Sequence, residues 1–328
     1  MAVTLKDVAE RAGVSRSAVS RTYTEGASVS PKTRQKVERA ALELGYSPNV
    51  LASSLTTGRT KLIGLVSNNF HNPIFLEVFD LFTRGLQERG LRPLLVNLSD
   101  EIDPEASIRM LKQYSVDAVI VASSTLPPSF AHGFQDAGVP VVHSFGRLSE
   151  SPRVHTVGID NIAAGRLAAE TLLAHGYKRI SMMAGPEGAT STQDRVRGFL
   201  DAAGERAHVS VSYASQYSFD AGRKEMLRLL SGERAEAYFC GDDVLSIGAL
   251  SAAQSLGLKV PNDLGFIGLN DMKMAGWENI DLTTIHNPIA EIVKTSIALV
   301  GELLSGSSLQ PQAHLLECSV VERGTLSP

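Results

Sequence analysis

Residues 4–22 read TLKDVAERAGVSRSAVSRT, and this stretch decides the fold of the N-terminal part of the chain. Its first apolar residues recur at the spacing of one helix face, at Leu5, Val8, Ala9 and Ala12. Thr4 and Asp7 are spaced as a capping pair at the start of this predicted helix. Gly13 supplies the left-handed conformation that ends it, and Ser15 caps a second helix directly afterwards. The stretch therefore predicts two short helices joined by a tight turn.

The second predicted helix has an apolar face and a polar face. Ala18, Val19 and the methyl group of Thr22 turn inward. Four polar side chains remain outside, namely Arg16, Ser17, Ser20 and Arg21. A third helix is predicted over residues 30–45, with Pro31 in its first turn. Three such helices form a helix-turn-helix unit whose second helix enters the DNA major groove, and a helical bundle with a solvated arginine face is the alternative.

The charge of the chain is distributed unevenly. Residues 1–61 hold ten Lys and Arg against five Asp and Glu, a net charge of +5, whereas the remaining residues carry −9. A basic end on an acidic body allows that end to approach a polyanion while the rest is repelled. The charge pattern therefore favours a nucleic-acid-binding headpiece.

From residue 62 onward, short apolar runs alternate with amphipathic segments. Strands are predicted at residues 62–66, 93–98, 118–121, 139–142, 180–183, 238–240 and 264–268, with helices such as 75–89 and 162–175 between them. This alternation predicts parallel sheets wrapped by helices, and so many strands favour two lobes. Ligands of such sheets bind beyond the carboxyl ends of the strands. We therefore expect a site between the lobes.

The sequence argues against several other classes of protein. It has no apolar run of about 18 residues and no apolar signal segment at its start, so we expect a cytoplasmic protein without a membrane span. Cys240 and Cys318 lack partners at metal-ligand spacing and are interpreted as reduced thiols. Neither a dinucleotide nor an NTP-binding glycine loop follows a predicted strand, and no catalytic triad is evident. We predict no cofactor, no metal and no catalytic residue.

The N-terminal residues resemble the headpiece of the lactose/galactose repressor family of bacterial transcriptional regulators. The matching segments are TLKDVA (4–9), AGVS (12–15), VSR (19–21), VS (29–30), TR (33–34) and LGYSPN (44–49). The resemblance implies that Arg16, Ser17 and Arg21 read bases and that Ser30 and Thr33 lie near phosphates. The segment YTEG (23–26) departs from the family pattern, so no phosphate contact is assigned to it.

Residues 48–61 follow as a segment that is either a plain linker or a hinge. In the family, this segment forms a helix only on DNA, and a pair of such helices inserts leucines into the minor groove. Asn49, Ala52 and Leu55 match its DNA-contacting positions, with Leu55 as the wedge that opens a base step. Ser53 stands where many members carry Arg.

The body resembles that of the same family, which is similar to periplasmic sugar-binding proteins. This resemblance implies an effector site at Ile74, Phe75, Arg147, Asp160, Ser191, Arg195, Tyr217, Asp242 and Asn270. Structural roles are the alternative for each residue: Phe75 in the core, Arg195 in a surface ion pair, or Asp160 as a helix cap.

Two cleft positions depart from the family together. Asp242 stands where many relatives have Asn or Ser, and Asn270 stands where they have a ligand-contacting Asp. An amide donates as well as accepts hydrogen bonds, so the effector should present a different hydroxyl pattern from that of common family sugars. The adjacent acids Asp242 and Asp243 also raise a metal hypothesis, which lacks a third ligand at usable spacing.

The sequence thus predicts an all-α helix-turn-helix headpiece followed by an α/β two-lobed domain like that of periplasmic binding proteins. We expect the headpiece at 1–47, the hinge at 48–61 and the body at 62–328. Its first lobe comprises about 62–159 plus 287–318, and its second about 160–286 plus 319–328. The expected function is that of a repressor, a homodimer or tetramer on a pseudo-palindromic operator in double-stranded DNA, controlled by a sugar-like effector. A periplasmic solute receptor and an α/β enzyme are the alternatives.

Overall fold

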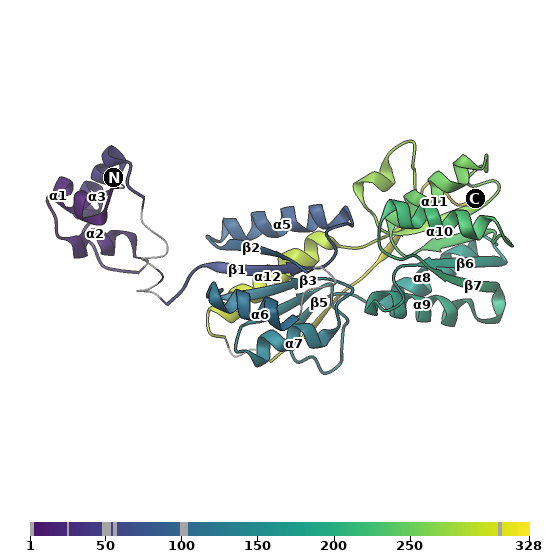
Figure 1. Cartoon of the computed structure of the whole chain (residues 1–328), viewed down its shortest axis with the longest axis horizontal. Helices are drawn as coiled ribbons and strands as arrows, with labels where there is room; N and C mark the ends of the chain where they lie inside the picture. The colour runs from purple at the N-terminus through teal and green to yellow at the C-terminus, as the bar shows by residue number, and fades with distance from the viewer. Residues whose placement is uncertain (1–2, 25, 48–53, 55–57, 99–103, 308–309) are drawn as a thin grey trace. The chain divides into compact units, whose positions relative to one another are not determined.

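The computed structural model describes residues 3–24, 26–47, 54, 58–98, 104–307 and 310–328. The chain forms two compact units, Met1–Thr60 and Lys61–Pro328, which Figure 1 shows in one view. Asn49, Ala52 and Leu55 lie outside the described residues, as does most of the predicted hinge. Their DNA contacts and the wedge role of Leu55 therefore stay predictions.

The first unit contains the three predicted helices, α1 (Leu5–Ala12), α2 (Arg16–Tyr23) and α3 (Pro31–Leu44). Thr4 and Asp7 form a reciprocal capping box at the start of α1, and Gly13 ends it with a φ of 64°. Ser15 caps α2. Ser30 caps α3, whose first residue is a proline. The predicted caps of α1 and α2 are confirmed. Each involves groups only a few residues apart, so the local sequence is enough to predict it.

The headpiece core is small and lies where the three helices meet. Val8 of α1, Val19 of α2 and Val37 of α3 are fully buried in it. Two hydrogen bonds between residues far apart in the sequence reinforce this packing. Arg11 Nε donates to Glu43 Oε2 at 2.8 Å, and Arg34 Nη1 donates to the Thr22 carbonyl at 2.9 Å. The core holds α2 with its polar face outward.

The first lobe of the second unit contains a six-stranded parallel sheet in the order β11-β5-β4-β3-β1-β2. Its strands are β1 (Leu62–Ser67), β2 (Arg92–Asn97), β3 (Ala118–Ala122), β4 (Val141–Ser144), β5 (His155–Ile159) and β11 (Ala313–Leu316). Helices α5 (Ile74–Glu88) and α12 (Ile289–Leu304) share one apolar cluster with one face of the sheet. The other face packs against α6 (Pro104–Gln113) and α7 (Pro128–Asp136).

The second lobe repeats this three-layer arrangement. Its sheet has the order β12-β10-β9-β8-β6-β7, parallel except for the β10–β12 pair. The strands are β6 (Arg179–Ala184), β7 (His208–Tyr213), β8 (Ala237–Cys240), β9 (Gly265–Asn270), β10 (Thr284–His286) and β12 (Ser319–Val321). Helices α8 (Asn161–Ala174) and α9 (Thr190–Ala203) cover one face, and α10 (Phe219–Leu230) and α11 (Asp243–Ser255) cover the other (Figure 1). Short 3-10 helices occur at η1 (Gly204–Arg206) and η2 (Lys273–Gly276).

The chain passes between the lobes three times, after β5, after β10 and after β11. These crossings place α12 and β11 back in the first lobe and return β12 to the second. All seven predicted strands are present, and the two-lobed α/β prediction is confirmed. Five strands were not predicted: β5, β7, β10, β11 and β12. No helix in the described part of the chain is long and apolar enough to cross a membrane.

Candidate functional site

The headpiece presents the polar face of α2 to solvent. Arg16, Ser17, Ser20 and Arg21 are all exposed. Arg21 Nε donates to the Ser17 carbonyl at 3.3 Å, and the Ser17 hydroxyl lies 2.9 Å from that of Ser15. Two guanidinium groups and two hydroxyls therefore project from one short helix, the donor set that suits guanine edges and phosphates.

Ser30 and Thr33 lie together at the start of α3. The Thr33 amide donates to Ser30 Oγ at 3.2 Å, and the two hydroxyls are 2.8 Å apart. Exposed ion pairs join Lys6 to Glu10 and Arg34 to Glu38. Within the described residues, neither Arg16 nor Arg21 has an ion-pair partner. The exposed polar face of α2 therefore keeps the positive charge of Arg16 and Arg21.

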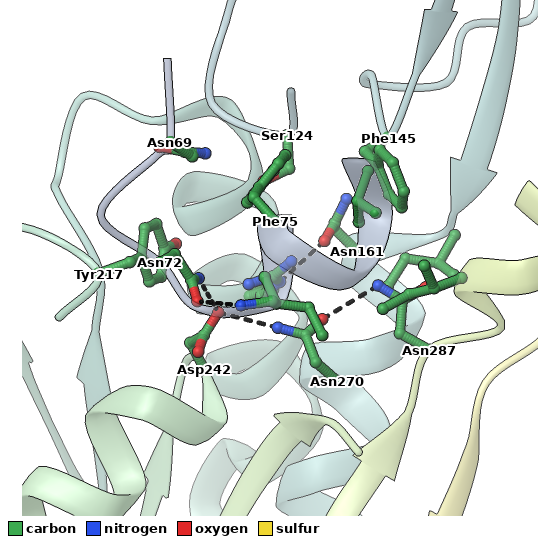
Figure 2. A pocket seen from close by; sticks show the side chains of 15 residues that line it. Asn69, Asn72, Phe75, Ser124, Phe145, Asn161, Tyr217, Asp242, Asn270 and Asn287 are labelled. Carbon is green, nitrogen blue, oxygen red and sulfur yellow. Dashed lines mark hydrogen bonds between the residues drawn. The ribbon is translucent and has the colours of Figure 1, made fainter. Parts of the chain in front are cut away.

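A cavity lies between the two lobes, at the carboxyl ends of the strands of both sheets (Figure 2). The first lobe lines it through the segments after β1, β3, β4 and β5. The second lobe lines it through α9, the last residue of β9, and the segments after β7, β8 and β10. The lining residues are Asn69, Asn72, Ile74, Phe75, Val78, Ser124, Phe145, Ile159, Asn161, Arg195, Tyr217, Asp242, Asn270, Asn287 and Ile289. The position is the one expected for a ligand site in such sheets.

A chain of amide and carboxylate hydrogen bonds crosses the cavity floor. Asn287 Nδ2 donates to Asn270 Oδ1 at 3.0 Å, and Asn270 Nδ2 donates to Asp242 Oδ2 at 2.8 Å. Asn72 Nδ2, from the first lobe, donates to the same Asp242 oxygen at 2.7 Å. Figure 2 shows these four side chains meeting below Phe75. Asp242, one of the two positions at which the sequence departs from the family, thus links the two lobes directly through its hydrogen bond with Asn72.

Arg195 is a buried cation beside this chain. Arg195 lies on α9. Its Nε donates to Asn161 Oδ1 at 2.8 Å, and its Nη1 donates to the Gly241 carbonyl at 2.7 Å. Only 5% of the residue is exposed, so it is not in the surface ion pair given above as its alternative role. Its charge lies close enough to Asp242 to favour the ionised carboxylate.

The electrostatics of Asp242 reflect two opposing effects. Burial raises the pKa of Asp242 to about 6, and hydrogen bonds from the Val244 amide, Asn72 and Asn270 lower it, as does the charge of Arg195. Val244 N lies 2.8 Å from Asp242 Oδ1 because Asp242 also caps α11. The carboxylate is thus held by three N–H donors and is placed to change its protonation near neutral pH.

The upper wall of the cavity is apolar and aromatic. Ile74 and Phe75 begin α5, and the ring of Phe75 lies 6.3 Å from that of Phe145, nearly edge to face. Tyr217 also faces the cavity, and its hydroxyl lies 2.8 Å from that of Thr192. The cavity volume is about 30 Å³. Since one water molecule needs roughly 10–15 Å³ by this measure, a ligand larger than a few waters enters only if lobes or side chains move.

Three of the predicted effector residues do not line this cavity. Asp160 is exposed and accepts from the Ile162 and Ala163 amides as the N-cap of α8, which is the structural role given above as its alternative. Ser191 is buried in the first turn of α9, where its hydroxyl has no hydrogen-bond partner among the described residues.

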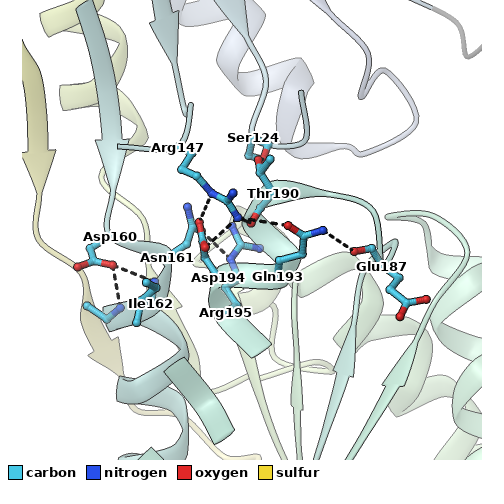
Figure 3. Close-up of polar contacts among 11 residues, drawn as sticks. Ser124, Arg147, Asp160, Asn161, Ile162, Glu187, Thr190, Gln193, Asp194 and Arg195 are labelled. Carbon is cyan, nitrogen blue, oxygen red and sulfur yellow. Dashed lines mark hydrogen bonds and ion pairs between the residues drawn. The ribbon is translucent and has the colours of Figure 1, made fainter. Parts of the chain in front are cut away.

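Arg147 is the third of these residues, and it joins the lobes instead. Its Nε and Nη2 form a bidentate pair with Asp194 of α9 at 2.7 and 2.8 Å, and Nη2 also donates to the Thr190 carbonyl at 3.0 Å (Figure 3). The Thr190 hydroxyl donates in turn to the Ser124 carbonyl at 3.2 Å. The guanidinium is turned toward α9. Arg147 therefore forms a contact between the lobes and does not line the cavity.

Sequence reasoning missed several lining residues, of which Asn72 and Asn287 matter most. Both belong to the tetrapeptide HNPI, which occurs at residues 71–74 and again at 286–289. Each copy precedes a helix of the first lobe, α5 or α12, and each contributes its Asn and its Ile to the cavity. The repeated tetrapeptide is the signal that could have identified both asparagines.

The adjacent acids Asp242 and Asp243, at the start of α11, raised a metal hypothesis in the sequence. Within the described ranges, no group of three His, Cys, Asp or Glu residues is arranged to hold a metal ion. Asp242 faces the cavity, whereas the Asp243 carboxylate accepts from Thr284 Oγ1 at 2.5 Å and from the Met272 amide at 2.7 Å. The two carboxylates therefore have different surroundings.

Comparison with known families matches two parts of the chain. Residues 4–49 match the family model of bacterial regulatory proteins of the lacI family, and residues 169–326 match the periplasmic binding protein-like domain. The HTH-type transcriptional repressor PurR of Pectobacterium carotovorum is 32% identical over 99% of this chain and 97% of its own length. The HTH-type transcriptional regulator DegA of Bacillus subtilis is 31% identical over 100% of this chain and 99% of its own.

Solved structures resemble the whole chain. The lac repressor dimer bound to operator and the anti-inducer ONPF has a TM-score of 0.89 and 26% identity, with 100% of both chains covered. The transcriptional regulator CelR in complex with cellobiose has a TM-score of 0.73 and 29% identity, with 98% of this chain and 99% of that chain covered.

Proposed function

Since this chain belongs to the LacI family of bacterial regulatory proteins, we propose that it is an operator-binding transcriptional repressor controlled by a small molecule bound between its lobes. The observation that carries the DNA part is α2, which exposes Arg16, Ser17, Ser20 and Arg21 on a capped, packed helix. The observation that carries the effector part is the interlobe cavity at the strand ends.

The DNA-reading proposal assigns base contacts to α2. Arginine pairs with two acceptors of guanine in the major groove, and such a contact is worth about 1 to 3 kcal/mol of discrimination. One headpiece covers few base pairs, so two copies of the chain on a pseudo-palindromic operator complete the site. A function on operator DNA also supports our proposal that the protein works in the cytoplasm.

The test is an operator selected from random duplexes, followed by titration of that operator and of a scrambled duplex at fixed salt. Arg21→Ala should reduce the ratio of the two affinities roughly 5- to 150-fold, the factor that corresponds to about 1 to 3 kcal/mol. Arg39→Ala is the matched control, because Arg39 is an exposed arginine of α3 outside the reading helix. An unchanged ratio for Arg21→Ala would remove this residue from base reading.

The effector proposal rests on the chemistry of the cavity. Amides, one carboxylate and one guanidinium offer both donors and acceptors, while Phe75, Phe145 and Tyr217 offer aromatic surface. This combination suits a neutral or weakly charged hydroxylated ring, so we propose a sugar or sugar derivative. The cavity is small, so ligand entry requires lobes or side chains to move. We propose that the lobes move, because a change in lobe angle can alter the hinge.

The effector test is a thermal-shift screen of purified protein against sugars, sugar acids, sugar phosphates and nucleobases. A ligand at 100 times its Kd adds about 2.7 kcal/mol to the free energy of unfolding. Binding that persists unchanged in Asn72→Ala would place the ligand outside the cavity. The same panel tests the competing enzyme hypothesis. Chemical turnover of a bound compound would support an enzyme function and contradict the effector proposal.

A further inference from the structure

Asp243 is a buried ionisable residue that the proposed site does not use directly. It is the first residue of α11, it is fully buried, and it does not line the cavity. Asp242 already caps α11 through the Val244 amide, so the start of the helix does not require a second acid. A buried carboxylate carries a desolvation cost, so its partners show what it holds in place.

The two oxygens of Asp243 bind two different elements. Oδ2 accepts from the Met272 amide, just after β9, and Oδ1 accepts from the Thr284 hydroxyl, at the start of β10. The space for the carboxylate comes from Gly268, because a Cβ at that position would lie 2.2 Å from Asp243 Oδ1. One side chain thus ties α11, the end of β9 and β10 together.

The turn held by Asp243 is conformationally strained. Asn270 has a φ of 118° and Asp271 a φ of 53°, and neither is a glycine. Such conformations persist only when surrounding contacts enforce them. Asp271 is held by Arg323 Nη2 at 2.7 Å and lies 3.0 Å from His286 Nδ1, while Asp243 fixes the next amide along the chain.

The elements tied by Asp243 carry the polar floor of the cavity. Asp242 precedes it as the N-cap of α11, Asn270 ends β9, and Asn287 follows β10. We propose that Asp243 is a positioning residue of the effector site, which holds the Asn270 turn so that Asn287, Asn270 and Asp242 form one hydrogen-bonded chain. The proposal rests on the proposed effector function for its purpose, but its geometry is tested without any ligand.

The ionisation of Asp243 should also be visible near neutral pH. Burial raises the pKa of Asp243 to about 7, and the nearby Asp242 and Asp271 raise it as well, while its two hydrogen bonds lower it. Among the described residues, the other charged or titratable groups around this cluster are Arg195 beside Asp242, Arg323 and His286 beside Asp271, and the buried Cys240 thiol near Asp243. Substitution at 243 separates its titration from theirs.

The test is NMR of the full-length, deuterated protein between pH 5.5 and 8.5, without ligand. The readouts are the side-chain amide signals of Asn270 and Asn287 and the hydrogen exchange of the Met272 amide. In Asp243→Ala, both side-chain signals should move, and Met272 should exchange roughly tenfold faster, the factor for loss of about one net hydrogen bond. Asp243→Asn keeps one acceptor and gains a group that can donate to Thr284, so the Asn270 and Asn287 signals should stay near those of wild type. They should lose the pH dependence that comes from Asp243 and keep the part that comes from Asp242.

Asp220→Asn is the matched control, because Asp220 is an exposed acid in the first turn of α10 and should change none of these signals. A folded Asp243→Ala protein with unchanged Asn270, Asn287 and Met272 signals would overturn the proposal. If Asp243→Ala does not fold, Thr284→Val removes one donor and keeps the carboxylate. It should move the same side-chain signals, and unchanged signals in that variant would equally refute the positioning role. Failure of the effector screen with success here would reject the effector function alone.

Discussion

Arg195→Ala tests whether the buried guanidinium beside the cavity holds the second lobe together. The substitution removes two hydrogen bonds from a charged donor and leaves Asn161 Oδ1 and the Gly241 carbonyl buried without it. Hydrogen bonds to charged groups contribute about 1.5 to 3 kcal/mol each, so the free energy of unfolding should fall by about 3 to 5 kcal/mol.

The loss should also depend on pH. In the folded protein the pKa of Asp242 is about 6, above the ordinary 3.8, so ionisation of this group reduces stability as pH rises from about 4 to 6. The charge of Arg195 limits that rise in pKa, and its removal raises the folded pKa further. The difference between wild type and Arg195→Ala should therefore be larger at pH 8 than at pH 5.

The assay is urea unfolding of the full-length protein at both pH values, followed by circular dichroism. Arg197→Ala is the control on the same helix: the Arg197 side chain is 71% exposed, its ion pair with Asp201 spans 3.7 Å, and its loss should cost less than about 0.5 kcal/mol. If the two variants differ by less than about 1 kcal/mol, Arg195 does not hold the lobe. Operator titration with effector then asks whether a folded Arg195→Lys variant still responds.

Three further outcomes are expected. Arg147→Ala and Asp194→Ala should each lower stability by about 1 kcal/mol and fail to add in the double variant, because they remove the same interlobe ion pair; full additivity would show that the pair is not coupled. Asp243→Asn should remove the part of the stability loss that develops between about pH 4 and 7, on the order of 4 kcal/mol for a pKa of about 7, and an unchanged urea midpoint profile would contradict this. Gly268→Ala should destabilise by about 1 to 3 kcal/mol because its Cβ meets the Asp243 carboxylate, whereas Gly301→Ala in α12, with open space around it, should not; thermal unfolding compares the two.

The sequence determined the features that depend on near neighbours. The capping pair Thr4–Asp7, the left-handed Gly13 and the Ser15 cap of α2 all involve groups three or four residues apart, and each prediction holds. Buried strands can also be predicted as apolar runs, as for β3, whose five residues are all buried. The edge strand β7 alternates exposed residues with partly or fully buried ones, and its buried residue is a serine, so hydropathy alone did not find it.

The candidate cavity was only partly visible in the sequence. Six of the nine predicted effector residues line it, because strand ends and family resemblance locate the carboxyl edge of each sheet. Asn287 and Ile289, which were not predicted, reach the cavity through the lobe crossing after β10, whose spatial path the local pattern does not specify. Arg147 shows the same limit, since its partner Asp194 is fixed by where α9 packs.

What only the tertiary structure decided is which polar groups satisfy one another. Asn72 and Asp242 are 170 positions apart, yet their side chains are 2.7 Å apart between the lobes. The sequence predicted Asp242 at the cleft but did not single out Asn72, although both residues follow strand ends. Their pairing follows from the packing of two sheets and three crossings, because a buried polar group must find its partner wherever the fold brings one.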